Sequence, residues 1–467
     1  MIDFKPYYLT ALDHLLRPSY VRFVLSFQVE KAQTAIAALE SGVFRLVSEL
    51  PFLAGNVTNP GKCRDRSNAL MIEPPSEDYL RHHPILRIQY HRGSITQIAS
   101  VDGLRSSLLP IPDTASAVYP TPALRFQANI MEDGILICIC WHHCFMDGLG
   151  AHVVLESLAR SCRHASASTM PLPATAQQQE SIRSQIEAYF LQSPATLGYN
   201  GAYGLSEYRF SGDQISCRFT LCPNRVGLLA RMCNAAISKD ESTPTRLTDD
   251  DVVTAAVWLC GSRGRYRASS PVGATGLKTS SLMRPVDIRR AIQPPIPRTY
   301  VGNGILFARS YCTVEDLGLD RGDIDTIHGE PRVKPATLNS LLNLACATRA
   351  ACASVNAEHI RDVLSCMKAV DHWASFNMCP ADIYISSLRR FPLYALDFGP
   401  DFGPVVDVDA LESTLDTQCG ILPARAQTPQ TAWEVRIALP EKAMQYLQED
   451  ELMAWLRADV VRPSSRL

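Results

Sequence analysis

An uninterrupted apolar stretch that ends in two histidines places the strongest constraint on the fold of this chain. Residues 135–140, Ile-Leu-Ile-Cys-Ile-Cys, are rich in β-branched side chains and short enough to form a buried strand. Residues 148–163 carry apolar side chains at helical spacing, and Asp147 stands just before them, where an acidic residue favours a helix start. The pattern predicts a buried strand, a turn that carries His142 and His143, and a helix.

The two histidines should serve different purposes, because side chains alternate across a strand. His142 and His143 are expected to point in opposite directions, so that only one of them faces a given cavity. An imidazole has an ordinary pKa of about 6.5 and is well suited to accept a proton at neutral pH. A second pair, His82-His83, is followed by neither an Asp nor a Gly at the same spacing, and offers an internal comparison.

Three interpretations of His-His-x-x-x-Asp-Gly compete on these residues alone. The histidines could be satisfied core residues at a strand end. His143 and Asp147 could bind a metal ion, but no third ligand in a metal-type spacing is visible, and adjacent strand residues diverge. We therefore expect no metal. In the third interpretation one histidine is a general base.

The composition of the whole chain is that of an ordinary soluble globular protein with two or three domains. Of the 467 residues, 46% are hydrophobic and 20% are charged. The net charge of −2 gives no reason to expect a nucleic-acid partner. No run of 18 apolar residues suggests a membrane span, so we expect no membrane partner.

Cysteine usage and the two chain ends bear on the compartment. The 15 cysteines are an odd number without a Cys-x-x-Cys pair, as expected of free thiols in a reducing compartment. The first residues show no secretory signal, which favours the cytoplasm. The last three, Ser465-Arg466-Leu467, differ from a peroxisomal address by one basic-for-basic replacement, so a peroxisomal location is the alternative.

The spacing of apolar residues and the positions of turn-forming residues outline the rest of the chain. A linker is expected after residue 164, where Ser, Ala, Thr, Gln and Pro become frequent. The predicted division is an N-terminal domain at 1–170, a crossover linker at 171–210 with one helix around Ile182, and a C-terminal domain at 211–467. Strands are predicted at 21–27, 124–130, 135–140, 215–220, 280–290, 383–388 and 433–439, and helices at 35–47, 148–163, 223–236, 252–263, 336–371 and 441–457.

Four motifs, in order along nearly the whole chain, carry a resemblance to a known superfamily. They are Pro51-Phe52-Leu53-Ala54-Gly55, the His-His-x-x-x-Asp-Gly motif, Val286-Asp287-x-Arg289 followed by Tyr300-x-Gly302-Asn303, and Asp397-Phe398-Gly399. With them the chain resembles chloramphenicol acetyltransferases, peptide-synthetase condensation domains and plant BAHD acyltransferases. Its layout is most similar to fungal acetyltransferases of secondary metabolism, such as the trichothecene acetyltransferases. The plant Asp-Phe-Gly-Trp-Gly signature lacks its Trp here, where Pro400 follows Gly399.

The resemblance implies an α/β fold and a reaction. Two similar chloramphenicol-acetyltransferase-like domains, each a mixed β-sheet flanked by helices, would enclose an active-site channel at their interface. His143 would be the general base that takes a proton from an acceptor hydroxyl as it attacks the thioester of an acyl-CoA. The expected protein is a monomer that binds no resident cofactor, with acetyl-CoA as co-substrate and a small hydroxylated secondary metabolite as acceptor.

Further site residues are carried over by the same resemblance. Asp147 would point away from the substrate and pair with Arg289 in a structural role. The channel would also include His142, Gly148, Asn303, Ser387, Asp397 and Gly399. For Asn303 a simple turn role is an equal alternative, and Asp397-Phe398-Gly399 is equally explained as a glycine-rich turn.

Two other functions remain open from the sequence. A condensation-type enzyme would take its acyl group from a carrier-protein thioester, although no carrier segment is attached to this chain. A repurposed relative, for example a cyclising enzyme, would use the pocket without acyl transfer. The intact His143 favours acyl transfer, and O-acetylation is the leading hypothesis.

Overall fold

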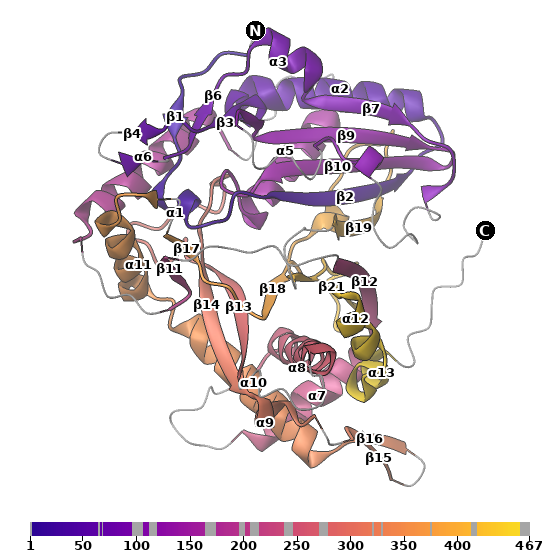
Figure 1. The fold of residues 1–467 in the computed structure, drawn as a ribbon. Coiled ribbons are helices and arrows are strands. Elements are labelled where there is room, and N and C mark those ends of the chain that lie inside the picture. Colours follow the sequence, from indigo (N-terminus) through magenta and orange to yellow (C-terminus); the bar gives the residue numbers. More distant parts are fainter. Residues whose placement is uncertain are drawn as a thin grey trace.

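The computed structural model contains two mixed β-sheets, one above the other in Figure 1. It describes residues 2–63, 66–67, 69–95, 106–111, 119–163, 174–195, 201–205, 214–237, 246–269, 279–319, 322–327, 330–373, 376–411 and 418–457. Each sheet has helices packed on it, and each has its own large apolar core. The predicted α/β fold of two domains is confirmed.

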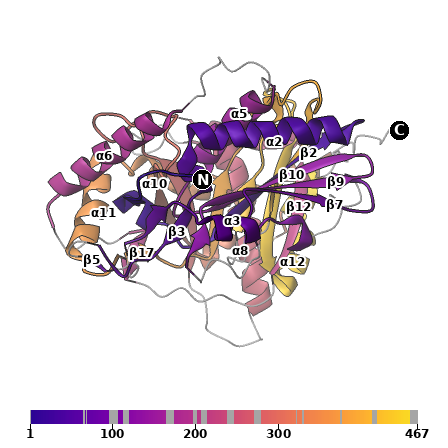
Figure 2. The ribbon, with the colours of Figure 1, turned by 90° about the horizontal axis from the view of Figure 1, so that it is seen from above.

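The first sheet holds the strand that the sequence pattern singled out. Its order is β19-β2-β10-β9-β7, with β2 at Tyr20–Gln28, β10 at Gly134–His142, β9 at Leu124–Met131 and β7 at Leu86–Tyr90. Strand β10 is antiparallel to both neighbours, and every one of its residues is buried. Helices α2 (Ala32–Glu49) and α5 (Gly148–Arg163) pack against each other over this sheet (Figure 2).

The second sheet is built from the later part of the chain. Its order is β12-β21-β20-β18-β13-β14, where β13 is parallel to β18 and β18 is parallel to β20. The strands are β12 (Gln214–Leu221), β21 (Trp433–Pro440), β20 (Gln418–Ile421), β18 (Ile383–Ser387), β13 (Thr279–Asp287) and β14 (Ile305–Thr313). The nearly apolar middle of α8 (Asp249–Ser269) is buried in the core against α10 and α12. This sheet is the central sheet of the second domain.

One strand from the later part of the chain joins the first sheet. Strand β19 (Val405–Leu411) pairs antiparallel with β2, and the turn before it inserts Phe398 and Phe402 against Phe27, with ring centroids 5.1 Å apart in both cases. The pairing supplies hydrogen-bond partners to what would otherwise be an edge strand. The boundaries 1–170, 171–210 and 211–467 stay a prediction, but the segment around β19 packs with the first domain.

The predicted linker region contains one well-packed helix. Helix α6 (Ala176–Gln192) buries Ile182, Ile186 and Phe190 in a third apolar cluster, together with α1 (Ala11–His14) and α11 (Ala357–Ala369). Residues 164–173, 196–200 and 206–213 lie outside the described residues.

Two long helices predicted in the second domain are each divided in two. The helix expected at 441–457 is α12 (Glu441–Gln448) followed by α13 (Glu451–Arg457), because Oδ1 of Asp450 accepts hydrogen bonds from the backbone N–H groups of Leu452 and Met453 at 3.1 Å and begins a new helix. The helix expected at 336–371 is α10 (Pro335–Ala353) followed by α11, and Asn356 caps the second of these.

The remaining elements are short, apart from the 14-residue helix α7. They are β1 (Tyr7–Tyr8), β3 (Asn56–Thr58), β4 (Lys62–Cys63), β5 (Arg66–Ser67), β6 (Met71–Glu73), α3 (Glu77–His82), β8 (Thr121–Pro122), β11 (Tyr203–Leu205), α7 (Pro223–Ala236), α9 (Val314–Leu317), β15 (Ile324–Ile327), β16 (Glu330–Val333), β17 (Phe376–Met378) and 3-10 turns at Pro51–Ala54, Ser106–Leu108 and Leu393–Ala395. The 14 cysteines whose side chains are described are all free thiols. Among the described residues, no helix is long and apolar enough to cross a membrane.

Candidate active site

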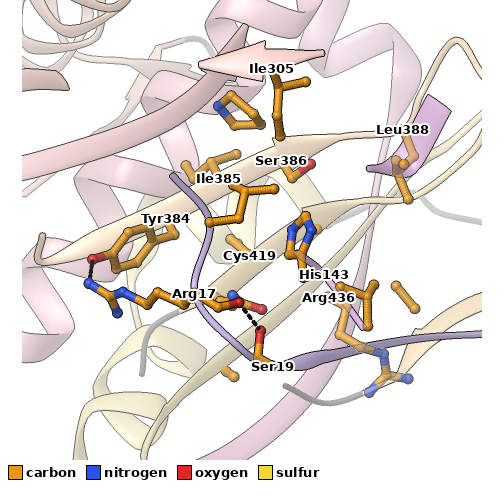
Figure 3. Close-up of a pocket in the computed structure, with 18 of the residues that line it drawn as sticks. Arg17, Ser19, His143, Ile305, Tyr384, Ile385, Ser386, Leu388, Cys419 and Arg436 are labelled. Carbon is orange, nitrogen blue, oxygen red and sulfur yellow. Dashed lines mark hydrogen bonds between the residues drawn. The ribbon is translucent and has the colours of Figure 1, made fainter. Parts of the chain in front are cut away.

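His143 follows the last residue of β10 and projects into a channel between the two sheets. Its backbone is held on both sides: the N–H donates to the carbonyl of Ser19 at 2.7 Å, and the carbonyl accepts from Nδ2 of Asn303 at 3.0 Å. The channel has a volume of about 1240 Å³ including its open mouth. Figure 3 shows the imidazole among side chains from both domains.

The channel wall is mainly apolar. Strand β2 contributes Tyr20, Val21 and Phe23, and the second domain contributes Ile305, Phe307, Met378, Ile385 and Leu388. The polar groups around the channel are few: Arg17, Ser19, Tyr384, Ser386, Gln418, Cys419 and Arg436 are among them (Figure 3). Arg17 donates to the hydroxyl of Tyr384 at 3.2 Å, and Arg436 is paired with Asp409. The space therefore suits a largely apolar molecule with a small number of polar contacts.

The two histidines do face different surroundings, as strand alternation predicts. His142 is fully buried, with its ring edge-to-face against Tyr20 at 5.5 Å and near Tyr119 at 6.4 Å. It does not line the channel, so the predicted channel role of His142 is corrected. Burial, with a smaller effect of the neighbouring His143, lowers the pKa of His142 to about 3. His142 is therefore a neutral core residue.

His143 is partly buried where it lines the channel, and its protonation is set by opposing influences. Burial lowers the pKa of His143 below its ordinary value, while the carbonyl of His143, the carboxylate of Asp147 and the carbonyl of Met146 oppose that shift. The imidazole is therefore neutral at pH 7. A neutral imidazole that faces a channel can accept a proton from a bound hydroxyl.

Asp147 points away from the channel and joins the two domains. Its Oδ2 lies 2.9 Å from Nη2 of Arg289, and the same oxygen accepts a hydrogen bond from the N–H of Gly304 at 2.9 Å. The other oxygen accepts from the N–H of Gly150 at 2.8 Å, within the first turn of α5. The predicted pair of Asp147 with Arg289 is present in the structure. Asp147 holds the histidine turn to the loop that follows β13.

Two glycines permit this close approach. A Cβ atom added to Gly150 would lie 1.8 Å from the carbonyl oxygen of Val301, and one added to Gly304 would lie 2.7 Å from Cζ of Arg289. Gly148, by contrast, lines the channel, and a Cβ there would make ordinary contacts at 3.5 Å with Leu388 and Phe391. Gly150 and Gly304 thus serve the domain junction, and Gly148 of the motif serves the channel.

Asn303 and Ser387, which the sequence placed in the channel, lie behind its wall. Asn303 is fully buried and connects Asp13 with the His143 carbonyl. The hydroxyl of Ser387 donates to Asp250 of α8 at 2.6 Å, on the helix-covered face of β18. Its neighbour Ser386 is exposed to the channel. The serine of β18 that faces the channel is therefore Ser386, one residue before the predicted Ser387. Successive side chains alternate between the two faces of a strand.

Asp397 and Gly399 form a turn at a separate surface hollow. Asp397 accepts a hydrogen bond from Arg163 at 2.8 Å, with both side chains about half exposed, and from the N–H of Gly399 at 2.9 Å. Gly399 has a φ of +97°, which favours glycine. Neither residue lines the channel. The turn interpretation of this motif is the one that fits, and it replaces the channel role.

Several channel residues carried no sequence signal. Tyr384 and Ser386 could have been found only by fixing which face of β18 is covered. Cys419 and Arg436 reach the channel through tertiary packing of β20 and β21. In the described ranges, no group of three or more His, Cys, Asp or Glu side chains is placed to hold a metal ion.

A fold of two α/β domains with a neutral histidine in the channel between them is that of a two-domain acyltransferase. Residues 104–453 match the model of the Transferase family, and residues 19–162 match the model of the trichothecene 3-O-acetyltransferase-like N-terminal domain. The chain belongs to the Transferase family.

Similar proteins extend over the full length of the chain. The communesin N16 acyltransferase of Penicillium expansum is 29% identical, covering 97% of this chain and 98% of its own. An O-acetyltransferase of Aspergillus campestris is also 29% identical, over 97% and 96%. The structure of F. graminearum TRI101 with coenzyme A and deoxynivalenol has a TM-score of 0.73 at 17% identity, over 97% and 99%, and shares the fold.

Proposed function

We propose that this enzyme transfers the acyl group of an acyl-CoA, most simply acetyl-CoA, to a hydroxyl of a small, largely apolar secondary metabolite. The observation that carries the proposal is the neutral imidazole of His143 inside an apolar channel between the domains. An apolar channel favours an uncharged acceptor, since burial of a charge without a partner is costly. The channel is completed by two domains of one chain, in keeping with a monomer.

The reaction follows from these groups. His143 takes the proton of the acceptor hydroxyl as its oxygen attacks the carbonyl carbon of the thioester. The tetrahedral intermediate collapses by breaking the carbon–sulfur bond, and the imidazolium returns the proton to the thiolate. The products are the ester and free CoA, and His143 is neutral again. The hydroxyl of Ser386 is one of the few hydrogen-bond donors that line the channel, and we assign it to the oxyanion that forms during the reaction.

The similar proteins support the donor and the kind of acceptor. One is a fumigaclavine B O-acetyltransferase of Aspergillus fumigatus, 27% identical over 97% of this chain. The TRI101 structures contain coenzyme A together with deoxynivalenol or T-2. The communesin enzyme is named for acylation at N16, so an amine acceptor is an outcome that the test should be able to reveal.

Calorimetric titration with acetyl-CoA and with free CoA tests the donor without knowledge of the acceptor. We expect saturable one-to-one binding of both. Hydroxylated and aminated apolar compounds are then screened for thiol release, with His143→Ala as the negative control and His82→Ala, in the exposed helix α3, as the positive one. If neither CoA nor longer acyl-CoAs bind, the carrier-protein hypothesis takes precedence. Wild-type turnover by His143→Ala would contradict the general-base role.

The location of the protein in the cell needs a separate test. The tripeptide Ser465-Arg466-Leu467 lies outside the described residues and stays a prediction. A fluorescent fusion that moves from peroxisomes to the cytosol on Leu467→Ala would support the address. An unchanged cytosolic distribution would favour the cytoplasm.

A further inference from the structure

The short N-terminal helix α1 carries a buried carboxylate that does more than cap it. Asp13 is 1% exposed. Its Oδ2 accepts hydrogen bonds from the N–H and the hydroxyl of Thr10, both at 2.7 Å, which completes a capping box. Its Oδ1 accepts from the N–H of Asn303 at 3.2 Å and from Nδ2 of Asn303 at 2.9 Å. The second oxygen thus reaches the loop of the other domain.

Asn303 also contacts the turn that carries His143. The same Nδ2 that donates to Asp13 donates its other hydrogen to the carbonyl of His143 at 3.0 Å. We propose that Asp13 is a positioning residue of the acyl-transfer site, which holds the His143 peptide through Asn303 and thereby aims the imidazole into the channel. This inference rests on the proposed function of His143.

The chemistry of the two acceptors explains why a carboxylate is needed. An ionised carboxylate and a peptide carbonyl can only accept hydrogen bonds, so both require the amide nitrogen of Asn303 on their side. If the amide turned over, its oxygen would face two other oxygens. Burial raises the pKa of Asp13 to about 6, and hydrogen bonds from Thr10 and Asn303 oppose the rise, so the carboxylate is ionised at pH 7. Asp13 therefore fixes the orientation of Asn303.

The same cap elsewhere in the chain shows that capping alone does not require this arrangement. Asp316 accepts from the N–H and hydroxyl of Thr313 at 2.8 and 2.9 Å at the start of α9, in an exposed position on the second domain. It uses one oxygen, Oδ2, just as Asp13 does toward Thr10. Burial of Asp13 and the use of its Oδ1 are additional to the cap.

Three variants separate positioning from capping. Asp13→Asn leaves one acceptor where two are needed, Thr10→Ala removes the hydroxyl of the cap but keeps Oδ1 on Asn303, and Asp316→Asn is the matched control. Calorimetry with acetyl-CoA gives the affinity, and thiol release with the acceptor found in the screen gives kcat. We expect Asp13→Asn to lower kcat about tenfold with an acetyl-CoA affinity within about twofold of wild type, as a small displacement of a base allows. Thr10→Ala and Asp316→Asn should lower kcat less than about threefold.

A double variant tests the route through Asn303. Asn303→Ala should lower kcat at least as much as Asp13→Asn, and the combination should be no slower than Asn303→Ala alone, because both act through one contact. Multiplying losses would overturn the proposed route. Equal losses in Asp13→Asn and Thr10→Ala would also overturn it, since the cap would then be the cause. If Asp13→Asn fails to fold, wild-type kcat in Asn303→Ala would overturn the proposal.

A readout independent of turnover distinguishes this inference from the function itself. In protein with isotope-labelled histidine, the ring signal of His143, assigned from its loss in His143→Ala, should move in Asp13→Asn and stay in place in Asp316→Asn. An unmoved signal in Asp13→Asn would overturn the positioning role. If the signal moves in Asp13→Asn but the wild-type protein binds no acyl-CoA, the proposed function is contradicted while the link between Asp13 and His143 stays supported.

Discussion

Nη2 of Arg289 lies 2.9 Å from Oδ2 of Asp147, and each side chain is only 1% exposed. Asp147 ends the turn that carries His143, whereas Arg289 follows β13 in the second domain. This buried pair is therefore a junction between the domains and not part of the reacting surface. Further hydrogen bonds to Gly150, Gly304 and Gly302 hold the two side chains in place.

Substitution of Asp147 should act mainly by lowering the free energy of unfolding, and only secondarily by lowering the rate of the reaction. Asp147→Asn leaves the guanidinium of Arg289 without its buried charge partner and with only the partly exposed Asp287 at 3.3 Å. Loss of one member of a buried pair typically costs about 3–5 kcal/mol, and the remaining contact with Asp287 places the expected loss at the low end of that range. Denaturant unfolding measures the change. Asp397→Asn is the control, because its pair with Arg163 is about half exposed and should contribute roughly 0–1 kcal/mol. Equal losses in the two variants would contradict the assignment.

On the acidic side, the pH profile of kcat/KM should decline at an unusually low pH. Burial lowers the pKa of His143 below its ordinary value of 6.5, and only the neutral imidazole is a base. The half-maximal point on the acidic side of the profile is therefore expected below pH 6.5. A half-maximal point above 6.5 would show that Asp147 and the nearby carbonyls outweigh burial.

The two adjacent serines of β18 form a matched pair. Ser386→Ala removes a hydroxyl from the channel and should lower kcat, by up to about 10²-fold if that hydroxyl stabilises the oxyanion. Ser387→Ala removes the 2.6 Å hydrogen bond to Asp250 and should lower the unfolding free energy by about 1 kcal/mol with kcat near wild type. Steady-state kinetics and denaturant melts on both variants would show the reverse result if the faces were misassigned.

Two glycines should respond differently to one added methyl group. Gly150→Ala places a Cβ 1.8 Å from the carbonyl oxygen of Val301, so the domain junction must shift and the melting temperature should fall by several degrees. Gly420 lines the channel and has open space around its Cβ position. Gly420→Ala should keep the melting temperature and raise KM for the bulkier acceptors of the screen. A stable Gly150→Ala protein would contradict the close packing at the junction.

The parts of the site that local pattern specifies were predictable, and those that tertiary contact specifies were not. The strand before His142 follows from a short uninterrupted apolar run, and helix α5 follows from a period of 3.6 residues. The structure has both elements where they are expected. The pairing of Asp147 with Arg289 came from the family resemblance, since no local rule connects positions so far apart in the chain.

The errors have the same origin. The pattern at 383–388 predicts the strand but not which of its faces carries α8, so it favours Ser387 where the structure exposes Ser386 to the channel. Asp397-Phe398-Gly399 was placed in the channel, whereas Phe398 is committed to the core beside Phe27. The contact of Asp13 with Asn303 joins the start of the chain to its second half, and the residues between give no sign of it.

The insertion of β19 beside β2 sets an order of events during synthesis. Until residues 405–411 leave the ribosome, the nine-residue strand β2 has an unpaired edge, and Phe27 lacks Phe398 and Phe402. An open edge of this kind is a template for pairing with other chains. We therefore expect the first domain to complete its sheet only after β19 has been synthesised. A fragment that stops before β19 would tend to aggregate, so the two domains should be inherited, expressed and redesigned as one unit.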